Sequence, residues 1–209
     1  MVDKTNNLLI DGATYELVDG EDMKATLFSE GQLNFTGTGN LAIRGKYKHA
    51  ICTDDYFKIL DGNITIKEAV SDAIHANDYI QIDGGTLTTN SVGDGLDCEE
   101  GYITINGGSQ TIKTTGQKGH GLKSETIINI NTTGTLDISV AGVASKGMSS
   151  GGNTNVYQGT VNISTSGNAI WESDENDFAS ASGIKCDGEH LIDNGSITVA
   201  VNGHCLAGG

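Results

Sequence analysis

The chain has 209 residues; 30 of them are glycine, none is proline, and charged residues make up only 19%. This composition argues against a helical bundle, which needs Ala, Leu, Glu and Lys in quantity. The formal net charge of −15 repels phosphate backbones, so we expect no nucleic-acid partner and regard cations as the natural counterparts. No apolar run of about 18 residues occurs, so the sequence predicts no transmembrane segment.

From residue 25 onward the chain repeats a five-residue pattern centred on an aliphatic anchor residue. We expect residues 1–24, which precede the first copy, to form a lead-in strand or cap. Successive anchors are 24, 23, 22, 26, 26, 36 and 22 residues apart by subtraction, which gives about seven turns of a periodic structure. The anchors are Leu27, Ile51, Ile74, Leu96, Leu122, Met148, Ile184 and Leu206.

Within each repeat, apolar and polar residues alternate with the two-residue period of a strand, as in residues 64–66, 80–82, 103–105 and 128–130. Gly- and Asn-rich turns separate these short strands. A single repeat cannot bury its own apolar face, so the repeats must stack, each strand pairing with its equivalent in the next coil. The sequence therefore predicts an all-β protein: a right-handed, single-stranded parallel β-helix (a solenoid) of about seven coils over residues 25–209.

Stacking also predicts which side chains lie above one another. Position two after the anchor holds only small residues, among them Cys98 and Cys186. We expect these cysteines to be buried and free, because two coils would separate them by about 14 Å, too far for a disulfide. Cys52 and Cys205 lie in other positions, and we expect them to be free as well.

Two further positions of the repeat are expected to face outward. The position two before the anchor, called here the leading file, holds Ala25, His49, Asp72, Asp94, His120, Lys146, Ser182 and His204. The position one after the anchor, called here the trailing file, holds Phe28, Cys52, His75, Asp97, Lys123, Ser149, Lys185 and Ala207. In the middle coils the two files gather acids and imidazoles side by side.

Carboxylates stacked about 5 Å apart repel one another unless a lysine, a proton or a metal ion lies between them. We expect a calcium site formed by Asp72, Asp94, Asp97 and Glu99, since calcium prefers oxygen ligands. Zinc would need three or four converging His or Cys ligands. The alternative is structural: Asp-Gly is good turn chemistry, and it recurs because the coil recurs.

The longest interval between anchors contains an acidic loop insertion at residues 167–181. It carries the only tryptophan, Trp171, beside Glu172, Asp174, Glu175 and Asp177. Insertions in a solenoid emerge as loops on one face, often the binding face, so the indole could stack on a sugar ring. The alternative is that Trp171 and Phe178 pack the loop onto the coil.

Catalysis has less support, because no nucleophile elbow, metalloprotease motif or phosphate loop occurs in a suitable sequence context. A polysaccharide lyase would need a base, for which Lys123, Lys146 and Lys185 are the candidates. A glycoside hydrolase would need two carboxylates about 5 to 9 Å apart, which acidic β-helices commonly offer.

Residues 72–87, 93–99 and 182–188 resemble the repeat of the bacterial carbohydrate-binding domain-containing β-helix proteins. That family is similar in fold to pectate lyases. The resemblance implies bound calcium, plant-type polysaccharide ligands that include acidic pectic chains, and a place outside the cell. Some coils carry His120, Lys146 or Ser182 in place of Asp, so the resemblance implies calcium ligands only in the coils of Asp72 and Asp94.

Together these observations predict a non-catalytic extracellular polysaccharide-binding module, assisted by calcium and favouring acidic, pectic glycans. We expect it to be secreted or at the cell surface, with a signal or lipid anchor outside this sequence. The alternatives are a polysaccharide lyase and a structural solenoid of a surface or adhesion protein. The expected glycan-binding residues are His49, His75, His120, Lys123 and Trp171.

Overall fold

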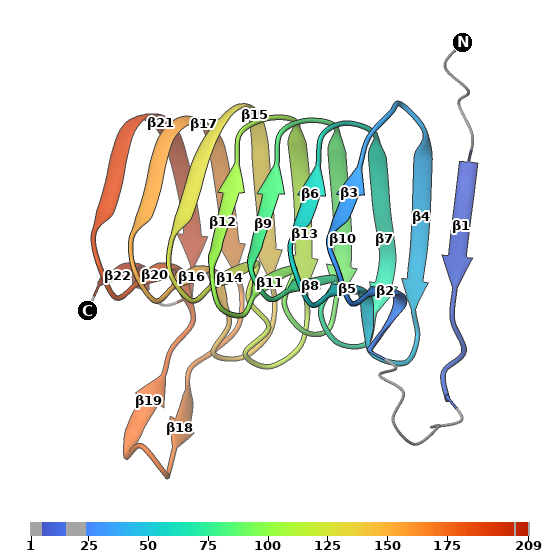
Figure 1. Ribbon diagram of the computed structural model, residues 1–209. Helices are drawn as coiled ribbons and strands as arrows, with labels where there is room; N and C mark the ends of the chain where they lie inside the picture. The colour runs from blue at the N-terminus through green and yellow to red at the C-terminus, as the bar shows by residue number, and fades with distance from the viewer. Residues whose placement is uncertain (1–5, 16–23, 203, 209) are drawn as a thin grey trace.

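The computed structural model describes residues 6–15, 24–202 and the backbone of 204–208. Every regular element in these residues is a strand, and the strands stack into a parallel β-solenoid of about six turns (Figure 1). This confirms the predicted all-β, parallel coiled architecture, with a coil number close to the predicted seven. In the lead-in segment, strand β1 (Asn6–Ile10) pairs in parallel with β4 (Asn40–Gly45); residues 1–5 and 16–23 lie outside the described residues.

The repeated five-residue pattern builds one sheet of eight parallel strands, called here the anchor sheet. The predicted anchors stand directly beside one another in its register, from Leu27 to Leu206. Its strands are β2 (Ala25–Ser29), β5 (His49–Thr53), β8 (Ile74–Ala76), β11 (Leu96–Cys98), β14 (Leu122–Ser124), β16 (Lys146–Ser150), β20 (Ser182–Cys186) and β22 (His204–Gly208).

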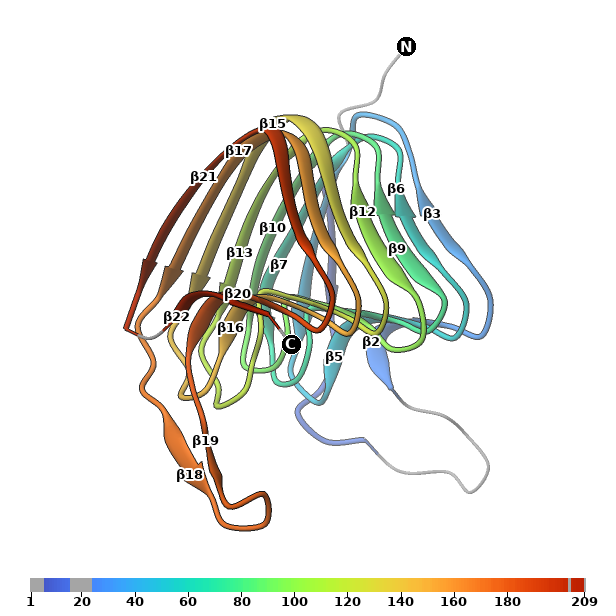
Figure 2. The ribbon, with the colours of Figure 1, turned by 90° about the vertical axis from the view of Figure 1, so that its left-hand side faces the viewer.

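The other two sides of each coil belong to one twelve-stranded sheet. Figure 2 shows its two rows of strands meeting opposite the anchor sheet. One row contains β1, β4, β7 (Asn63–Ala69), β10 (Thr86–Ser91) and β13 (Ser109–Thr114), and the other contains β3 (Leu33–Phe35), β6 (Phe57–Ile59), β9 (Tyr79–Ile82) and β12 (Tyr102–Ile105). The long strands β15 (Ile128–Val140), β17 (Thr154–Thr165) and β21 (His190–Val201) run through both rows.

Aliphatic side chains from all three sides fill the interior, and residues such as Ile80, Ile103 and Ile128 are stacked in register and fully buried. The glycine that precedes the anchor has a packing reason. A Cβ at Gly121 would lie 2.4 Å from the Cγ2 atom of Ile138 on the facing side, and 2.5 Å from the Gly147 carbonyl oxygen. In the Asp-Gly and His-Gly pairs of the repeat, a polar residue of the leading file therefore precedes a glycine that has no room for a side chain.

Cys52, Cys98 and Cys186 are buried, and the thiols of Cys98 and Cys186 are free, as the sequence predicts; the side chain of Cys205 lies outside the described residues. Burial raises the pKa of Cys98 to about 11, which makes its thiol a poor nucleophile.

The acidic insertion forms an antiparallel hairpin of β18 (Ile170–Glu172) and β19 (Asp177–Ala179), called here the hairpin arm. The arm projects from the solenoid on the side of the anchor sheet (Figures 1 and 2). Trp171 lies opposite Phe178 with an edge-on ring contact, and these side chains are 51% and 62% exposed. The alternative that the two aromatics pack the loop onto the coil is therefore wrong; they pack on each other.

Candidate functional site

The anchor sheet brings the predicted acids and imidazoles of the middle coils into one connected group, called here the charged network. In it, His49 Nδ1 lies 3.0 Å from Asp72 Oδ2, and His75 Nδ1 lies 3.0 Å from Asp97 Oδ2. Lys123 Nζ lies 2.9 Å from Asp97 Oδ1 and 3.7 Å from Asp94 Oδ2. The members are His49, Asp72, His75, Asp94, Asp97, Glu99 and Lys123. The sequence thus predicts correctly that these side chains gather.

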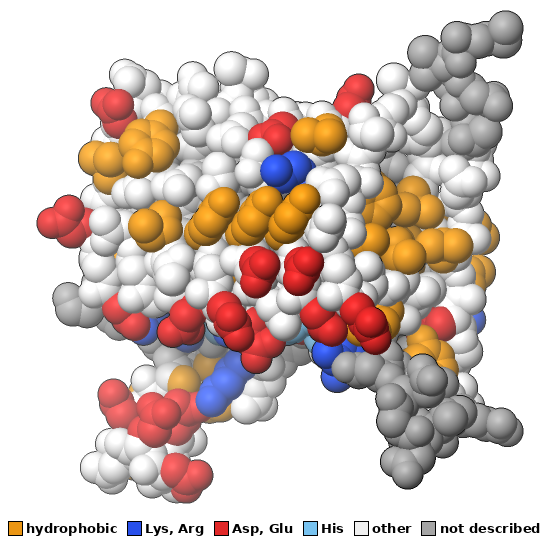
Figure 3. All heavy atoms as spheres, in the orientation of Figure 1, with side chains coloured by type: hydrophobic (Ala, Val, Ile, Leu, Met, Phe, Trp, Pro, Cys, Tyr) orange, Lys and Arg blue, Asp and Glu red, His pale blue; other side chains and the backbone are white. Residues whose placement is uncertain are grey.

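The expectation that both files face open solvent is wrong for their central members. His49, Asp72, Asp94 and Asp97 are only 6–8% exposed, although Glu99 and Lys123 reach the surface. The reason is that the side chains of the leading file lie along the solenoid axis, against the next coil, instead of pointing away from the sheet. Charged side chains gather visibly at the lower edge of the molecule, where the anchor sheet lies (Figure 3).

The leading file forms a hydrogen-bond ladder that the sequence analysis missed. In each step a side chain accepts a hydrogen bond from the backbone N–H of the same position in the next coil. Asp72 Oδ1 accepts from Asp94 at 2.6 Å, Asp94 Oδ1 accepts from His120 at 2.6 Å, and His120 Nδ1 accepts from Lys146 at 3.0 Å. His49 Nδ1 starts the ladder, accepting from the Asp72 N–H at 3.3 Å. Aspartate and histidine can both occupy this position because both offer a short side-chain acceptor.

The ladder ends at Lys146, whose ammonium group has no acceptor to offer. The N–H of the next leading residue, Ser182, donates instead to the Ser145 carbonyl oxygen at 3.2 Å. This break coincides with the long interval between anchors that contains the hairpin arm. The ladder thus supports the structural reading of the repeated Asp-Gly pairs in the middle coils.

Asp97 sits between two basic groups. Burial alone would raise its pKa, but the hydrogen bond from His75 and the ammonium of Lys123 bring the pKa below its ordinary value. Burial alone would lower the pKa values of His75 and Lys123, but the Asp97 carboxylate beside them raises both pKa values above their ordinary range. His75 Nε2 also lies 3.3 Å from Glu99 Oε2. These groups therefore hold their charges by mutual pairing.

Asp94 and His120 are shifted toward their neutral forms. Burial and the Asp72 carboxylate raise the pKa of Asp94 to about 7. Burial, helped by the ammonium groups of Lys146 and Lys123, lowers the pKa of His120 to about 3. His120 is therefore a neutral imidazole at neutral pH, and its Nδ1 is available as the acceptor that the ladder needs.

The four predicted calcium ligands fit calcium poorly in this arrangement. Calcium takes about 6 to 8 oxygen ligands. Here Asp72 Oδ1 and Asp94 Oδ1 accept backbone N–H groups, and the two oxygens of Asp97 face His75 and Lys123. Lys123 stands between Asp94 and Asp97, where a bridging ion would have to lie. Calcium assistance stays a prediction, and it needs Lys123 to move.

Four lysines gather beside the C-terminal half of the anchor sheet, although the chain as a whole is strongly acidic. We call Lys118, Lys123, Lys146 and Lys185 the basic cluster. Burial and the nearby ammonium groups of Lys185 and Lys118 lower the pKa of Lys146. Lys146 makes no ion pair within the described residues, whereas the other three lysines pair with Glu172, Asp97 and Asp187. The Glu172 and Asp94 carboxylates offset this lowering only in part, so an anionic ligand would stabilise the Lys146 ammonium group.

The hairpin arm is tied to this cluster by the ion pair between Lys118 and Glu172. Residues 117–118 and 170–175 line a hollow of about 330 Å³ along β18 and the tip of the arm. Trp171 and Lys118 are among its lining residues, so the predicted sugar-stacking residue lies beside Lys118. The expected glycan-binding residues are therefore divided: His49, His75 and Lys123 belong to the charged network, His120 to the ladder and Trp171 to the arm.

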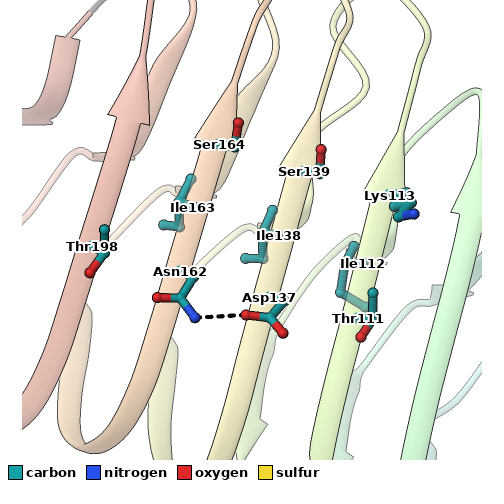
Figure 4. Close-up of a pocket in the computed structure, with 10 residues that line it drawn as sticks. All are labelled: Thr111, Ile112, Lys113, Asp137, Ile138, Ser139, Asn162, Ile163, Ser164 and Thr198. Carbon is teal, nitrogen blue, oxygen red and sulfur yellow. Dashed lines mark hydrogen bonds between the residues drawn. The ribbon is translucent and has the colours of Figure 1, made fainter.

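A second polar surface, not predicted from the sequence, runs across β13, β15, β17 and β21 (Figure 4). Thr111, Asp137, Asn162 and Thr198 occupy neighbouring positions in register, and Asn162 donates a hydrogen bond to Asp137 at 2.7 Å. They border a shallow hollow of about 200 Å³. No motif marks these residues, because isolated Thr, Asn and Asp are ordinary on the outer face of a strand.

Lys118 is also a residue whose role the sequence did not reveal. It lies outside both files, in a loop that only the fold brings next to the insertion. The sequence suggests Lys146 and Lys185 only as possible catalytic bases. Their charge is the sequence signal for a basic cluster, because they occupy file positions that carry acids in other coils.

Comparison with known proteins agrees with the parallel β-solenoid fold and shows the family. The model of the carbohydrate-binding domain-containing protein family matches residues 1–209. A comparison with curated proteins finds no match. A solved structure described as the polysaccharide lyase-like protein from C. thermocellum, gadolinium derivative, is similar with a TM-score of 0.59 and 22% identity. The match covers 98% of this chain and 64% of that one, and at this identity it shows the fold alone. The part of this chain that the structure describes has no helix able to cross a membrane. Since the family model matches its whole length, the chain belongs to the carbohydrate-binding domain-containing protein family.

Proposed function

We propose that this protein is a non-catalytic, extracellular polysaccharide-binding module that favours acidic glycans. The observation that carries the proposal is the basic cluster at the outer edge of the anchor sheet. Lys146 is half-buried, lacks an ion pair within the described residues and lies near Lys118 and Lys185. A glycan carboxylate placed there would relieve the repulsion between these ammonium groups. Polymeric glycans of this kind lie outside cells, which is why we propose an extracellular place.

The neighbouring hairpin arm supports a sugar ligand. Trp171 and Phe178 are exposed aromatic side chains that contact each other on a projecting hairpin, and tryptophan is enriched at binding interfaces. The indole can lie on the apolar face of a pyranose ring while a carboxylate of the same chain reaches Lys146 or Lys185. The acidic tip of the arm, with Asp174 and Glu175, would repel a polyanion and so help to orient it.

The test is affinity electrophoresis in gels containing polygalacturonate or a neutral β-glucan. We expect polygalacturonate to retard the wild-type protein, and the double variant Lys146→Met, Lys185→Met to lose most of this retardation. Lys113→Met, which removes an exposed lysine from β13, is the matched control and should bind like the wild type. Equal retardation of all three proteins, or binding of the neutral glucan alone, would refute the preference for acidic glycans.

Calcium assistance is a separate part of the proposal, motivated by the acids of the charged network and by the net charge of the chain. Retardation by polygalacturonate is measured with added calcium and with a chelator. Stronger retardation with calcium would support a calcium bridge to the glycan. Unchanged retardation would assign the carboxylate to the lysines alone.

Lys146 also makes a lyase the second candidate function. A lowered pKa brings a lysine closer to the range in which it can act as a general base. In a β-elimination the base would take the proton next to the uronate carboxylate, and the glycosidic C–O bond would break. Ultraviolet absorbance of unsaturated products, present with the wild type and abolished in Lys146→Met, would favour the lyase over the binding module.

A further inference from the structure

The His49, Asp72 and His75 side chains converge in the upstream part of the charged network, away from the basic cluster. One candidate ligand atom from each residue lies within 4.8 Å of the other two. His49 Nδ1 and His75 Nδ1 lie 3.0 and 3.9 Å from the same oxygen, Asp72 Oδ2. Ligand atoms around a tetrahedral zinc ion are separated by about 3.4 Å, given Zn–N and Zn–O bonds of about 2.1 Å. The observed separations lie on either side of that value.

His49 Nδ1 lies 3.0 Å from Asp72 Oδ2 and 3.3 Å from the Asp72 N–H. While its single lone pair accepts the N–H, the two acceptors facing each other at 3.0 Å need a proton or a metal ion between them. A metal ion would take the His49 lone pair in place of the 3.3 Å hydrogen bond. The other oxygen, Asp72 Oδ1, is held by the Asp94 N–H, which orients the carboxylate.

The surroundings of His75 suit the same role. Its Nδ1 atom lies 3.0 Å from Asp97 Oδ2 and 3.9 Å from Asp72 Oδ2, and its Nε2 atom lies 3.3 Å from Glu99 Oε2. Metal binding therefore requires His75 to release the Nδ1 proton that pairs with Asp97, while the Nε2 proton stays with Glu99. A carboxylate behind the distal nitrogen is the usual arrangement for a metal-ligating histidine. The side chains of His49, Asp72 and His75 are 8%, 12% and 15% exposed, which fixes their geometry and leaves access from the side of His75.

We propose that His49, Asp72 and His75 bind one divalent transition-metal ion of the zinc class. Two imidazoles and one carboxylate suit such ions, whereas calcium favours a shell of oxygens. The ion would also balance the excess of carboxylates over basic groups around Asp72. This inference does not rest on the proposed glycan binding, since the cluster lies in other coils than Lys146 and Lys185.

The test uses protein stripped by a chelator and then titrated with Co²⁺ and with Zn²⁺. We expect one Co²⁺ per chain, seen by its visible ligand-field absorption, displacement of Co²⁺ by Zn²⁺, and a higher melting temperature with either ion. His75→Ala should lose the absorption and the thermal shift. This variant should fold, because the trailing file accepts residues as different as Cys52, Lys123 and Ser149 in the equivalent place.

Two further variants sharpen the result. Glu99→Gln, which changes only the residue behind His75, should weaken Co²⁺ binding about 10- to 100-fold. His120→Asn, which changes a histidine of the leading file outside the cluster, should bind like the wild type. The proposal is overturned if stripped wild-type protein binds no Co²⁺, if His75→Ala binds it equally well, or if an equal concentration of Ca²⁺ displaces it.

Discussion

His120 shows why the side chain two places before the anchor is polar in the middle coils. Its Nδ1 atom accepts the Lys146 N–H, as the oxygens of Asp72 and Asp94 accept from the coils that follow them. A buried N–H without an acceptor costs about 1 to 3 kcal/mol. At the residue scale, this ladder explains the recurrence of Asp and His without any ligand. A proposal of ligand binding must therefore rest on side-chain atoms that are not needed as acceptors in the ladder.

The ladder can be tested at His120, which is neutral at neutral pH. His120→Ala should lower the free energy of unfolding by about 1 to 3 kcal/mol, because the Lys146 N–H loses its acceptor. His120→Asn, whose amide oxygen can replace Nδ1, should keep most of that stability. Denaturant unfolding at neutral pH measures both. Equal losses for Ala and Asn would show that His120 acts by packing alone.

The same histidine predicts part of the acid sensitivity. Its pKa falls from 6.5 in the unfolded chain to about 3 in the fold, so between these values the unfolded state binds the extra proton. Stability contributed by neutral His120 is therefore full above about pH 6.5 and is lost as the pH falls toward 3. Melting temperatures from pH 7 down to 4 should fall less steeply for His120→Asn than for the wild type. Parallel curves would contradict the buried, neutral imidazole.

At the scale of elements, each coil matches small residues of the anchor sheet to large residues of the facing strands. Gly95 and Gly121 face Ile112 and Ile138. One coil earlier, the register puts Ala73 in the place of Gly95 and Thr89 in the place of Ile112. Where alanine takes the place of glycine on the anchor sheet, threonine takes the place of the larger isoleucine on the facing strand. The Thr89 hydroxyl is fully buried and has no hydrogen-bond partner among the residues that the structure describes.

Thr89→Val should therefore raise the free energy of unfolding by about 1 kcal/mol, because valine has the same shape and no unsatisfied hydroxyl. Thr89→Ile should gain less or lose stability, since its extra methylene has to fit beside the coil of Ala73. Thermal unfolding of the three proteins checks the order. Destabilisation by valine would mean that the hydroxyl has a partner, such as a buried water.

The sequence was sufficient for the elements but only partly for the site. The two-residue alternation and the anchor spacing are local properties of the sequence. They therefore predict the strands, their register and the gathering of His75, Asp97 and Lys123. Burial of Asp72 and Asp94 depends on side-chain direction along the axis, which spacing does not encode. The place of Lys118 beside Glu172 depends on how a loop and an insertion emerge from the coils, and no local pattern records that.

For the whole molecule, equivalent coils should be separable units whose stability adds through neighbouring contacts. Ile74 and Leu96 are paired equivalents, so deletion of residues 74–95 joins Ala73 to Leu96 without changing the register. This variant should keep a β-type circular dichroism spectrum and cooperative unfolding, with a lower melting temperature. Deletion of residues 74–85, about half a coil, should prevent folding because it joins strands of different sheets. Folding of both variants, or of neither, would contradict coil equivalence.

The proposed function depends on the basic cluster and on the hairpin arm that the Lys118–Glu172 ion pair holds beside it. The most direct test of the proposed function is a structure of the protein with an oligogalacturonate. We predict a uronate carboxylate in ion-pair contact with Lys146 or Lys185 and a sugar ring on Trp171. An oligosaccharide bound instead along Thr111, Asp137 and Asn162, with the lysines unoccupied, would contradict it.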